Sequence, residues 1–179
     1  MNEAIDTQPY QTVVIMGDLV ASRQAGSTQK VHKAFNRSVE AMNKAYAEGL
    51  ISPLTITLGD EFQGLINSFS GAFSLVRGMR LLLLRENVRC RFVIGGASIE
   101  TPVNREKAWN MMGPGLAEAR ELLGVRDENA YRFSLLEEPV LGRLLNTLGA
   151  VLTDIEQEWT PRQRELAIDY FYGVGESVT

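Results

Sequence analysis

The chain contains very few of the residues that build disulfides or zinc sites. Among its 179 residues there is one cysteine, Cys90, and one histidine, His32. A single cysteine cannot form an internal disulfide, which is typical of a protein from a reducing compartment. We therefore expect a cytoplasmic protein, and any metal site must be built from ligands other than the Cys and His sets that hold zinc.

Long apolar runs and an excess of positive charge are also missing. The longest aliphatic run, residues 81–84, is flanked by Arg80 and Arg85 and is far too short for a transmembrane helix. The first twelve residues have no basic residue and no apolar core, so they do not form a signal peptide. A net charge of −4 argues against a general binder of nucleic-acid backbones. We expect no membrane partner.

The pattern of apolar residues predicts alternating strands and helices. Strands are indicated by β-branched runs or period-2 alternation, and helices by a period of about 3.6 residues. These patterns predict strands over 13–16, 54–58, 61–66, 88–99 and 130–136, and helices over 28–49, 72–83, 114–124, 141–155 and from 161 onward.

In chain order these elements read β-α-β-β-α-β-α-β-α-α. Two βα crossovers enclose a hairpin, which is the ferredoxin-like split βαβ plan, an α+β fold whose sheet is covered by helices. The last strand and the last two helices are additions at the C-terminal end. We divide the chain into an α/β sandwich core, residues 12–136, and a helical extension, residues 137–179.

Three carboxylates fall at neighbouring strand ends of this plan. Asp18 follows the first strand, while Asp60 and Glu61 lie at the tip of the hairpin "TLGDEFQGLI". Because adjacent strands lie about 4.8 Å apart, such side chains can share one cation. Carboxylates without a His or Cys partner favour Mg²⁺ or Mn²⁺. The alternative is that Gly59-Asp60 is only a common turn sequence.

Cationic side chains and backbone N–H groups that could meet a triphosphate follow two motifs. "DLVASR" places a serine and an arginine just after Asp18. "MMGPG" opens a helix, whose first N–H groups attract anions. For the arginines, solvated loop positions or ion pairs with local acids are open alternatives. The candidate nucleotide-binding residues are Ser22, Arg23, Arg91, Gly113, Gly115 and Arg120.

Four segments together carry a family resemblance. "VVIMGDLVASR", "TITLGDEFQGLI", "RCRFVIGGASIETP" and "MMGPGLAEARELL", in this order, resemble the SatD family of bacterial proteins from about Thr12 to the end. More distantly, they are similar to the palm-like catalytic domain of class III nucleotide cyclases and diguanylate cyclases. That similarity implies that Asp18 and Asp60 are the metal pair. It also implies a nucleotide ligand and a homodimer, because class III cyclases place their site at a dimer interface.

Three departures from the cyclase pattern bear on catalysis. Leu58 stands where the "GGDEF" signature has its first glycine, and Ile56 falls near the lysine that reads the purine in many adenylyl cyclases. Leu116 replaces the asparagine of the Asn-x-x-x-Arg pair, although Arg120 is present. The catalytic residues therefore stay unassigned, and the sequence leaves open whether the chain is an enzyme.

The C-terminal segment "WTPRQRELAIDYFYGVGESVT" resembles the start of a helix-turn-helix, which SatD proteins also carry. DNA is expected as a partner only if a longer natural chain completes that motif. The alternative is an amphipathic helix that docks on the domain through Leu166, Tyr170 and Phe171.

Three functions follow from these observations. The first is a metal-dependent nucleotide-binding regulatory domain, linked to transcriptional or stress regulation. The second is a nucleotidyl- or phosphoryl-transfer enzyme of the cyclase-like class. The third is a catalytically inert protein-interaction domain, in which a neighbouring Lys or Arg neutralises the carboxylates.

Overall fold

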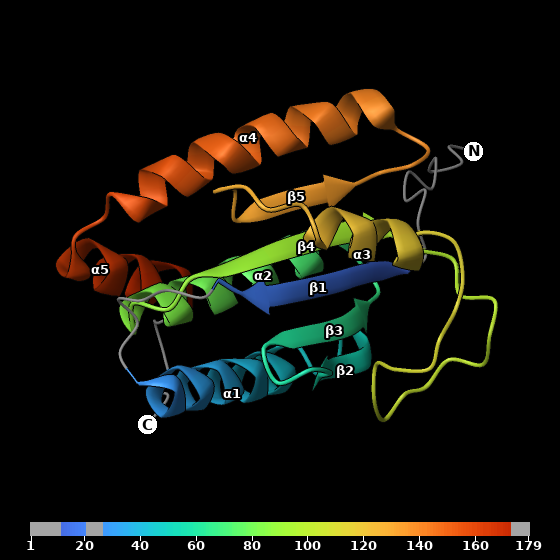
Figure 1. Ribbon diagram of the computed structural model, residues 1–179, viewed down its shortest axis with the longest axis horizontal. Helices are drawn as coiled ribbons and strands as arrows, with labels where there is room; N and C mark the ends of the chain where they lie inside the picture. Colours follow the sequence, from blue (N-terminus) through green and yellow to red (C-terminus); the bar gives the residue numbers. More distant parts are fainter. Residues whose placement is uncertain (1–11, 21–26, 173–179) are drawn as a thin grey trace, which may run out of the picture.

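The fold is known from a computed structural model that describes residues 12–20 and 27–172. In this part of the chain five strands form one sheet in the order β2-β3-β1-β4-β5 (Figure 1). The central strand β1 is antiparallel to both β3 and β4, and β5 is parallel to β4. The strands are β1 (Val13–Leu19), β2 (Leu50–Ile56), β3 (Glu61–Ile66), β4 (Cys90–Gly96) and β5 (Tyr131–Ser134).

The helices complete the predicted element order. The hairpin β2–β3 lies between two βα crossovers, and β1 is inserted between β3 and β4, so the split βαβ plan is confirmed. The helices are α1 (Thr28–Ala45), α2 (Phe69–Arg85), α3 (Leu116–Leu123), α4 (Pro139–Gln157) and α5 (Pro161–Tyr172). Over the described residues, no helix combines the length and apolar character that crossing a membrane requires.

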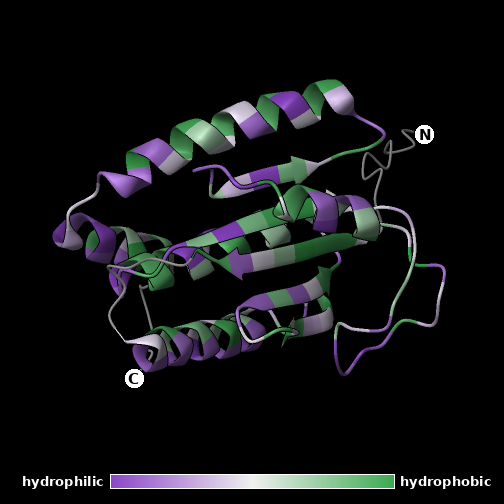
Figure 2. Cartoon of the chain, in the orientation of Figure 1, coloured by the Kyte–Doolittle hydropathy of each residue, from purple (hydrophilic) through white to green (hydrophobic). Residues whose placement is uncertain are grey.

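The apolar run of β1 reflects burial on both faces of the sheet. Val13 and Ile15 pack in the larger core beneath α1 and α2, whereas Val14 and Met16 pack in a second core beneath α3. Successive side chains of a strand point to opposite faces, so a strand between two helical layers needs apolar residues at every position. Figure 2 shows β1 as hydrophobic over most of its length, in contrast to the outer surface of α1.

The face of β4 that carries Arg91 is less solvated than the sequence indicates. Val93, on the same face, is fully buried, and Arg91 is largely covered. The reason is α3, which packs across β4 and β1 on this side of the sheet (Figure 1).

Two asparagines close the edges of the sheet. Asn43 of α1 accepts a hydrogen bond from the Leu54 N–H (2.7 Å) and donates one to its carbonyl (2.9 Å), at the β2 edge. Asn146 of α4 does the same for Phe133 at the β5 edge, with distances of 3.0 and 2.9 Å. Each side chain therefore takes the place of a neighbouring strand at one residue.

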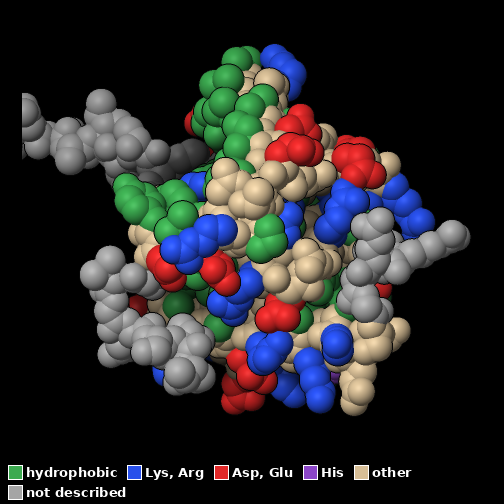
Figure 3. Space-filling view, turned by 90° about the vertical axis from the view of Figure 1, so that its left-hand side faces the viewer, with side chains coloured by type: hydrophobic (Ala, Val, Ile, Leu, Met, Phe, Trp, Pro, Cys, Tyr) green, Lys and Arg blue, Asp and Glu red, His purple; other side chains and the backbone are tan. Residues whose placement is uncertain are grey.

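Helix α4 packs on β5 and the larger core through small and polar residues together with the partly buried Leu145 and Leu152. Gly142, Gly149, Thr153 and Glu156 are its buried residues. The large apolar residues that predict this helix lie mostly on the other side, where Figure 3 shows hydrophobic side chains along the top of the molecule. The exposed members are Leu141, Leu144, Leu148, Val151 and Ile155.

A buried ionic cluster fixes the C-terminal half of α4 against the domain. The Glu156 carboxylate has no exposed surface and accepts hydrogen bonds from Arg80 Nε (2.6 Å) and the Tyr131 hydroxyl (2.8 Å). The Arg77 Nε lies 3.4 Å from its other oxygen, without hydrogen-bond geometry. Burial, followed by the Glu156 charge, raises the pKa of Tyr131 well above its ordinary value.

Helix α5 begins as predicted, because Thr160 and Gln163 cap each other's backbone N–H groups. It packs against α2, and the Arg77 guanidinium lies 4.1 Å from the ring centre of Phe171. The predicted apolar contacts are only partly correct, since Tyr170 is 81% exposed and Leu166 is half exposed. The helix docks through fewer apolar side chains than its sequence offers.

Candidate functional site

Charged residues from three strands and one helix meet on the α3 face of the sheet. Asp18, near the end of β1, lies opposite Glu61 of β3 and opposite Arg91 of β4 in the strand register. Arg120 reaches this group from α3. We call Asp18, Glu61, Arg91 and Arg120 the ionic site. Two acids and two bases make its side chains neutral overall.

Arg91 holds Asp18 through two parallel hydrogen bonds. Its Nε donates to Oδ1 of Asp18 at 3.0 Å, and its Nη2 donates to Oδ2. The two side chains are only 13% and 15% exposed, and Arg91 Nη1 also donates to the Val125 carbonyl at 3.2 Å. A two-point guanidinium–carboxylate pair in a partly buried position is among the stronger polar contacts in proteins. Asp18 is therefore neutralised within the domain.

The second pair of the ionic site is looser and more open. Arg120 Nη1 lies 3.8 Å from Glu61 Oε2, and its Nη2 donates to Gln63 Oε1 at 2.9 Å. Arg120 is 55% exposed, whereas Gln63 is buried. The exposed guanidinium can reorient toward a ligand at little cost, because water already solvates it.

A third arginine lies on the same face of the sheet and was missed by the sequence analysis. Arg132 of β5 is almost fully buried, forms an ion pair with Asp127 and donates to the Val125 carbonyl at 2.9 Å. Its Nη1 has no hydrogen-bond partner within the described part of the chain. Burial lowers the pKa of Arg132 from its ordinary value, although Asp127 opposes this effect. A charged residue inside the strand pattern "AYRFSLL" was the available signal.

The structure does not bring the three predicted metal ligands into one group. Asp60 is exposed in the turn between β2 and β3, where its carbonyl accepts the Leu19 N–H at 2.9 Å. Gly59, with φ of +83°, makes that turn, so this part of the motif has a structural role. Asp18 and Glu61 remain as the two carboxylates that face each other.

The predicted anion site at the start of α3 lies away from the ionic site. Gly115 is packed against Gly96, the last residue of β4, whereas Arg91 is near the first residue. A Cβ at Gly113 or Gly115 would lie about 2 Å from the carbonyl oxygen of Ser98 or Gly96, respectively. The Gly115 N–H already donates to Glu118. Both glycines therefore allow close backbone packing at the opposite end of β4.

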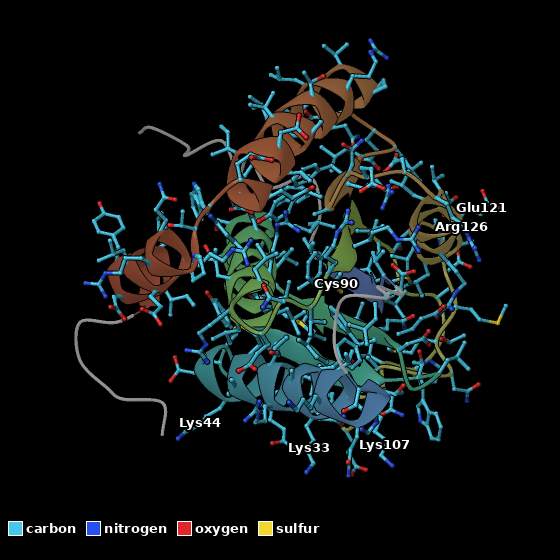
Figure 4. The ribbon with its side chains drawn as sticks, turned by 60° about the vertical axis from the view of Figure 1, so that its left-hand side comes forward. Lys33, Lys44, Cys90, Lys107, Glu121 and Arg126 are labelled. Atoms are coloured by element: carbon cyan, nitrogen blue, oxygen red, sulfur yellow. The ribbon has the colours of Figure 1, made fainter. Side chains whose placement is uncertain are left out.

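Two further candidates, Ser22 and Arg23, lie outside the described residues. His32 is exposed on α1, as expected. Cys90 is buried, and this burial, with a smaller effect of the Asp18 charge, raises the pKa of its thiol well above the ordinary value. Figure 4 shows Cys90 in the interior, while Lys33 and Lys44 project from α1 into solvent. Cys90 is therefore an inert core residue at neutral pH.

The ionic site fits a hard divalent cation in ligand type but not as a closed protein cage. Asp18 and Glu61 supply only oxygen atoms, which Mg²⁺ and Mn²⁺ prefer. Across residues 12–20 and 27–172, no group of three or more His, Cys, Asp or Glu side chains is arranged to hold a metal. Mg²⁺ in proteins is commonly held by one or two carboxylates together with substrate phosphates, and Asp18 and Glu61 fit this mode.

Together, the sheet order and the paired charges define an α+β domain of the ferredoxin-like plan with an ionic site at the end of its central strand. The sequence matches the SatD family over residues 12–171. The chain therefore belongs to the SatD family. No curated protein matches it.

Several nucleotide cyclases of known structure are similar in fold. One is the guanylate cyclase domain of RhGC from Catenaria anguillulae, whose structure was determined in complex with GTP. It is 16% identical in sequence, the comparison covers 66% of this chain and 75% of that chain, and the TM-score is 0.44. Another is a bacterial light-regulated adenylyl cyclase, with 12% identity, 69% and 75% covered, and a TM-score of 0.48. At such identities the similarity concerns the fold alone.

Proposed function

We propose that this chain is a metal-dependent nucleotide-binding domain with a regulatory role, and that the ionic site receives the phosphates. The observation that carries the proposal is the joint presence of two facing carboxylates and two arginines on one sheet face. Arginine guanidinium groups suit phosphate oxygens, and carboxylates suit the divalent cation that accompanies a nucleotide. Asp18 and Glu61 would hold Mg²⁺ or Mn²⁺, which would offset the phosphate charge.

The paired state of Asp18 and Arg91 supports a ligand that carries charges of both signs. An anion alone would have to separate Arg91 from Asp18 and leave the carboxylate unpaired in a largely covered position, which costs several kcal/mol. A cation alone would leave Arg91 unpaired in the same way. A metal–nucleotide complex supplies a new partner for each residue. We therefore expect nucleotide and metal to bind together and neither to bind tightly alone.

Calorimetry with a panel of nucleoside triphosphates, with and without Mg²⁺, tests this proposal. We expect heat of binding only when both are present, and its loss in Asp18→Asn and Arg91→Ala. Asp154→Asn is the matched control, because it removes one acid from an exposed position of α4 far along the chain. Absence of binding by the wild-type chain, or equal binding by Asp18→Asn and the wild type, contradicts the proposal.

A second candidate function is an inert protein-interaction domain that has kept this fold. The two-point Asp18–Arg91 pair favours this second function, because an inert domain is expected to have its carboxylates neutralised by a neighbouring Lys or Arg. In that case Asp18→Asn lowers the free energy of unfolding, and calorimetry detects no nucleotide binding by either the wild type or the variant.

The nucleotidyl-transfer alternative has less support among the described residues. Leu116 is buried in the second core, so its side chain fills space and offers no hydrogen bond to a ligand. Incubation with the four triphosphates followed by chromatography separates this alternative from binding, because a binding domain leaves the nucleotides intact.

A further inference from the structure

Helix α4 presents a continuous apolar stripe to the outside of the molecule. Its members are 40% to 55% exposed, and Figure 3 shows hydrophobic side chains gathered at the top of the molecule. A surface helix ordinarily turns its large apolar residues inward, whereas in α4 most of them are exposed and only Leu145 and Leu152 pack against the larger core. We call this set the α4 stripe, and it consists of Leu141, Leu144, Leu148, Val151 and Ile155.

The α4 stripe has the spacing of a helix-to-helix seam. Its members are separated by three, four, three and four residues. This repeat keeps side chains on one narrow line along a helix, where they can interlock with a second helix. Rotation of α4 cannot bury the stripe, because Gly149 packs closely on Tyr131 of β5 and Glu156 is held by Arg80 of α2 on the opposite face. Within residues 12–20 and 27–172, a partner for the stripe has to come from another molecule.

We propose that the α4 stripe is a homodimer surface, in which the α4 helices of two copies pack antiparallel about Leu148. The stripe reads nearly the same in both directions from this residue. Leu141 lies seven residues before it and Ile155 seven residues after it, and Leu144 and Val151 lie four before and three after. A two-fold axis near Leu148 places large apolar side chains opposite one another along the whole stripe.

The charges beside the stripe agree with the antiparallel arrangement. Arg143 and Asp154 are exposed, and neither takes part in an ion pair among the described residues. They are eleven residues apart, about three helical turns, so they lie on the same flank of α4. Arg143 precedes Leu148 by five residues and Asp154 follows it by six. In the antiparallel pair Arg143 of one copy therefore lies level with Asp154 of the other on the same side of the seam, whereas in a parallel pair the flank that carries these residues lies on opposite sides of the seam in the two copies.

The apolar area is sufficient for a specific dimer. Five half-exposed aliphatic side chains present about 500 Å² of apolar surface, and two copies together bury about 1,000 Å², which reaches the lower limit for a specific interface. Exposed Val140 and Leu136 adjoin the start of the stripe in sequence and add to this area. The stripe shares no residue with the ionic site.

Sedimentation velocity and light scattering on the 179-residue chain test the proposal. We expect a dimer for the wild type. In Leu148→Asp the dissociation constant should rise by at least about 100-fold, because the change places two negative charges next to each other at the two-fold axis. Leu58→Asp is the matched control, because Leu58 is 71% exposed in the β2–β3 turn. Circular dichroism confirms that each variant is folded. A monomeric wild type, or equal effects of the two substitutions, overturns the proposal.

Cysteine cross-linking tests the register. The native Cys90 is buried, so an introduced cysteine is the only accessible thiol in the described part of the chain. Under a mild oxidant we expect Leu148→Cys to form a disulfide-linked dimer readily and Leu141→Cys to do so slowly, since position 141 faces position 155 of the other copy. Arg143→Asp should weaken the dimer, and Arg143→Asp combined with Asp154→Arg should restore it. Equal cross-linking at 148 and 141, or no restoration by the double exchange, overturns the antiparallel arrangement.

Discussion

Replacing Glu156 with glutamine should be the most damaging single conservative change among the charged residues of α4. Its carboxylate has no exposed surface and accepts bonds from Arg80 and Tyr131, with Arg77 close to its other oxygen. Glu156→Gln keeps the size and the bond from Tyr131 but removes the charge. Arg80, itself only 4% exposed, then keeps a buried positive charge without an anionic partner.

The expected cost follows from this geometry. Removing one partner of a buried ion pair costs about 3–5 kcal/mol, because the remaining charge cannot be solvated. For a chain of this length each kcal/mol lowers the melting temperature by about 2–4 °C, so we expect a decrease of roughly 6–20 °C. Since stabilities of such domains are only about 5–15 kcal/mol, the variant should be marginal at physiological temperature.

Urea denaturation followed by circular dichroism measures this loss directly. Glu40→Gln is the control, because it makes the same change at an exposed position of α1 and should change stability by less than about 0.5 kcal/mol. Adding Arg80→Gln to Glu156→Gln should recover part of the loss, because the buried charge disappears. If Glu156→Gln and Glu40→Gln unfold at the same urea concentration, the ionic cluster does not stabilise α4 and the reasoning is wrong.

Three further predictions concern the packing of the C-terminal helices and the buried titrating groups. Gly149→Ala should destabilise the fold by about 1–3 kcal/mol, because the added Cβ would lie 3.0 Å from Tyr131. Gly142→Ala should be neutral or stabilising by up to about 1 kcal/mol, because the nearest atom to its added Cβ is 3.6 Å away. The melting temperatures of the two variants compare the two sites. Thr160→Ala should cost about 0.5–2 kcal/mol and shorten α5, as seen by amide exchange. Because burial raises the pKa values of Cys90 and Tyr131, both groups release protons more easily when the chain unfolds. The free energy of unfolding should therefore be flat at neutral pH and fall above about pH 9, by about 1.4 kcal/mol per pH unit for each group. Cys90→Ala should remove the part of this fall that begins near pH 9, and an unchanged slope in that variant contradicts the assignment.

The sequence was sufficient for the order of the elements and for the place of β1. A strand with apolar residues at every position fits only the interior of a sheet covered on both sides, so the run 13–16 determines its own location. The same order predicts that Asp18 and Glu61 lie at neighbouring strand ends. The identity of the residue that neutralises Asp18 depends on the register between β1 and β4, which single-sequence patterns do not determine.

Other features could not be predicted because the same sequence pattern occurs in two different structural settings. Glycines before a helix occur both at anion sites and at close backbone contacts, and the contact of Gly115 with Gly96 shows which applies here. The apolar period of α4 correctly predicted a helix. It could not indicate that the stripe faces outward, because the inward face is set by tertiary contacts, those of Gly142 with Leu135 and of Gly149 with Tyr131 of β5.

The asparagines at the sheet edges have a consequence for aggregation. An exposed edge strand offers free N–H and C=O groups, which can recruit a strand from another chain and start a cross-β assembly. Here Asn43 and Asn146 occupy such groups at the middle of β2 and at β5, and Pro53 removes one more donor from β2. The sheet is thereby protected from growth at both edges, and a fibril would have to begin by releasing an asparagine from its strand.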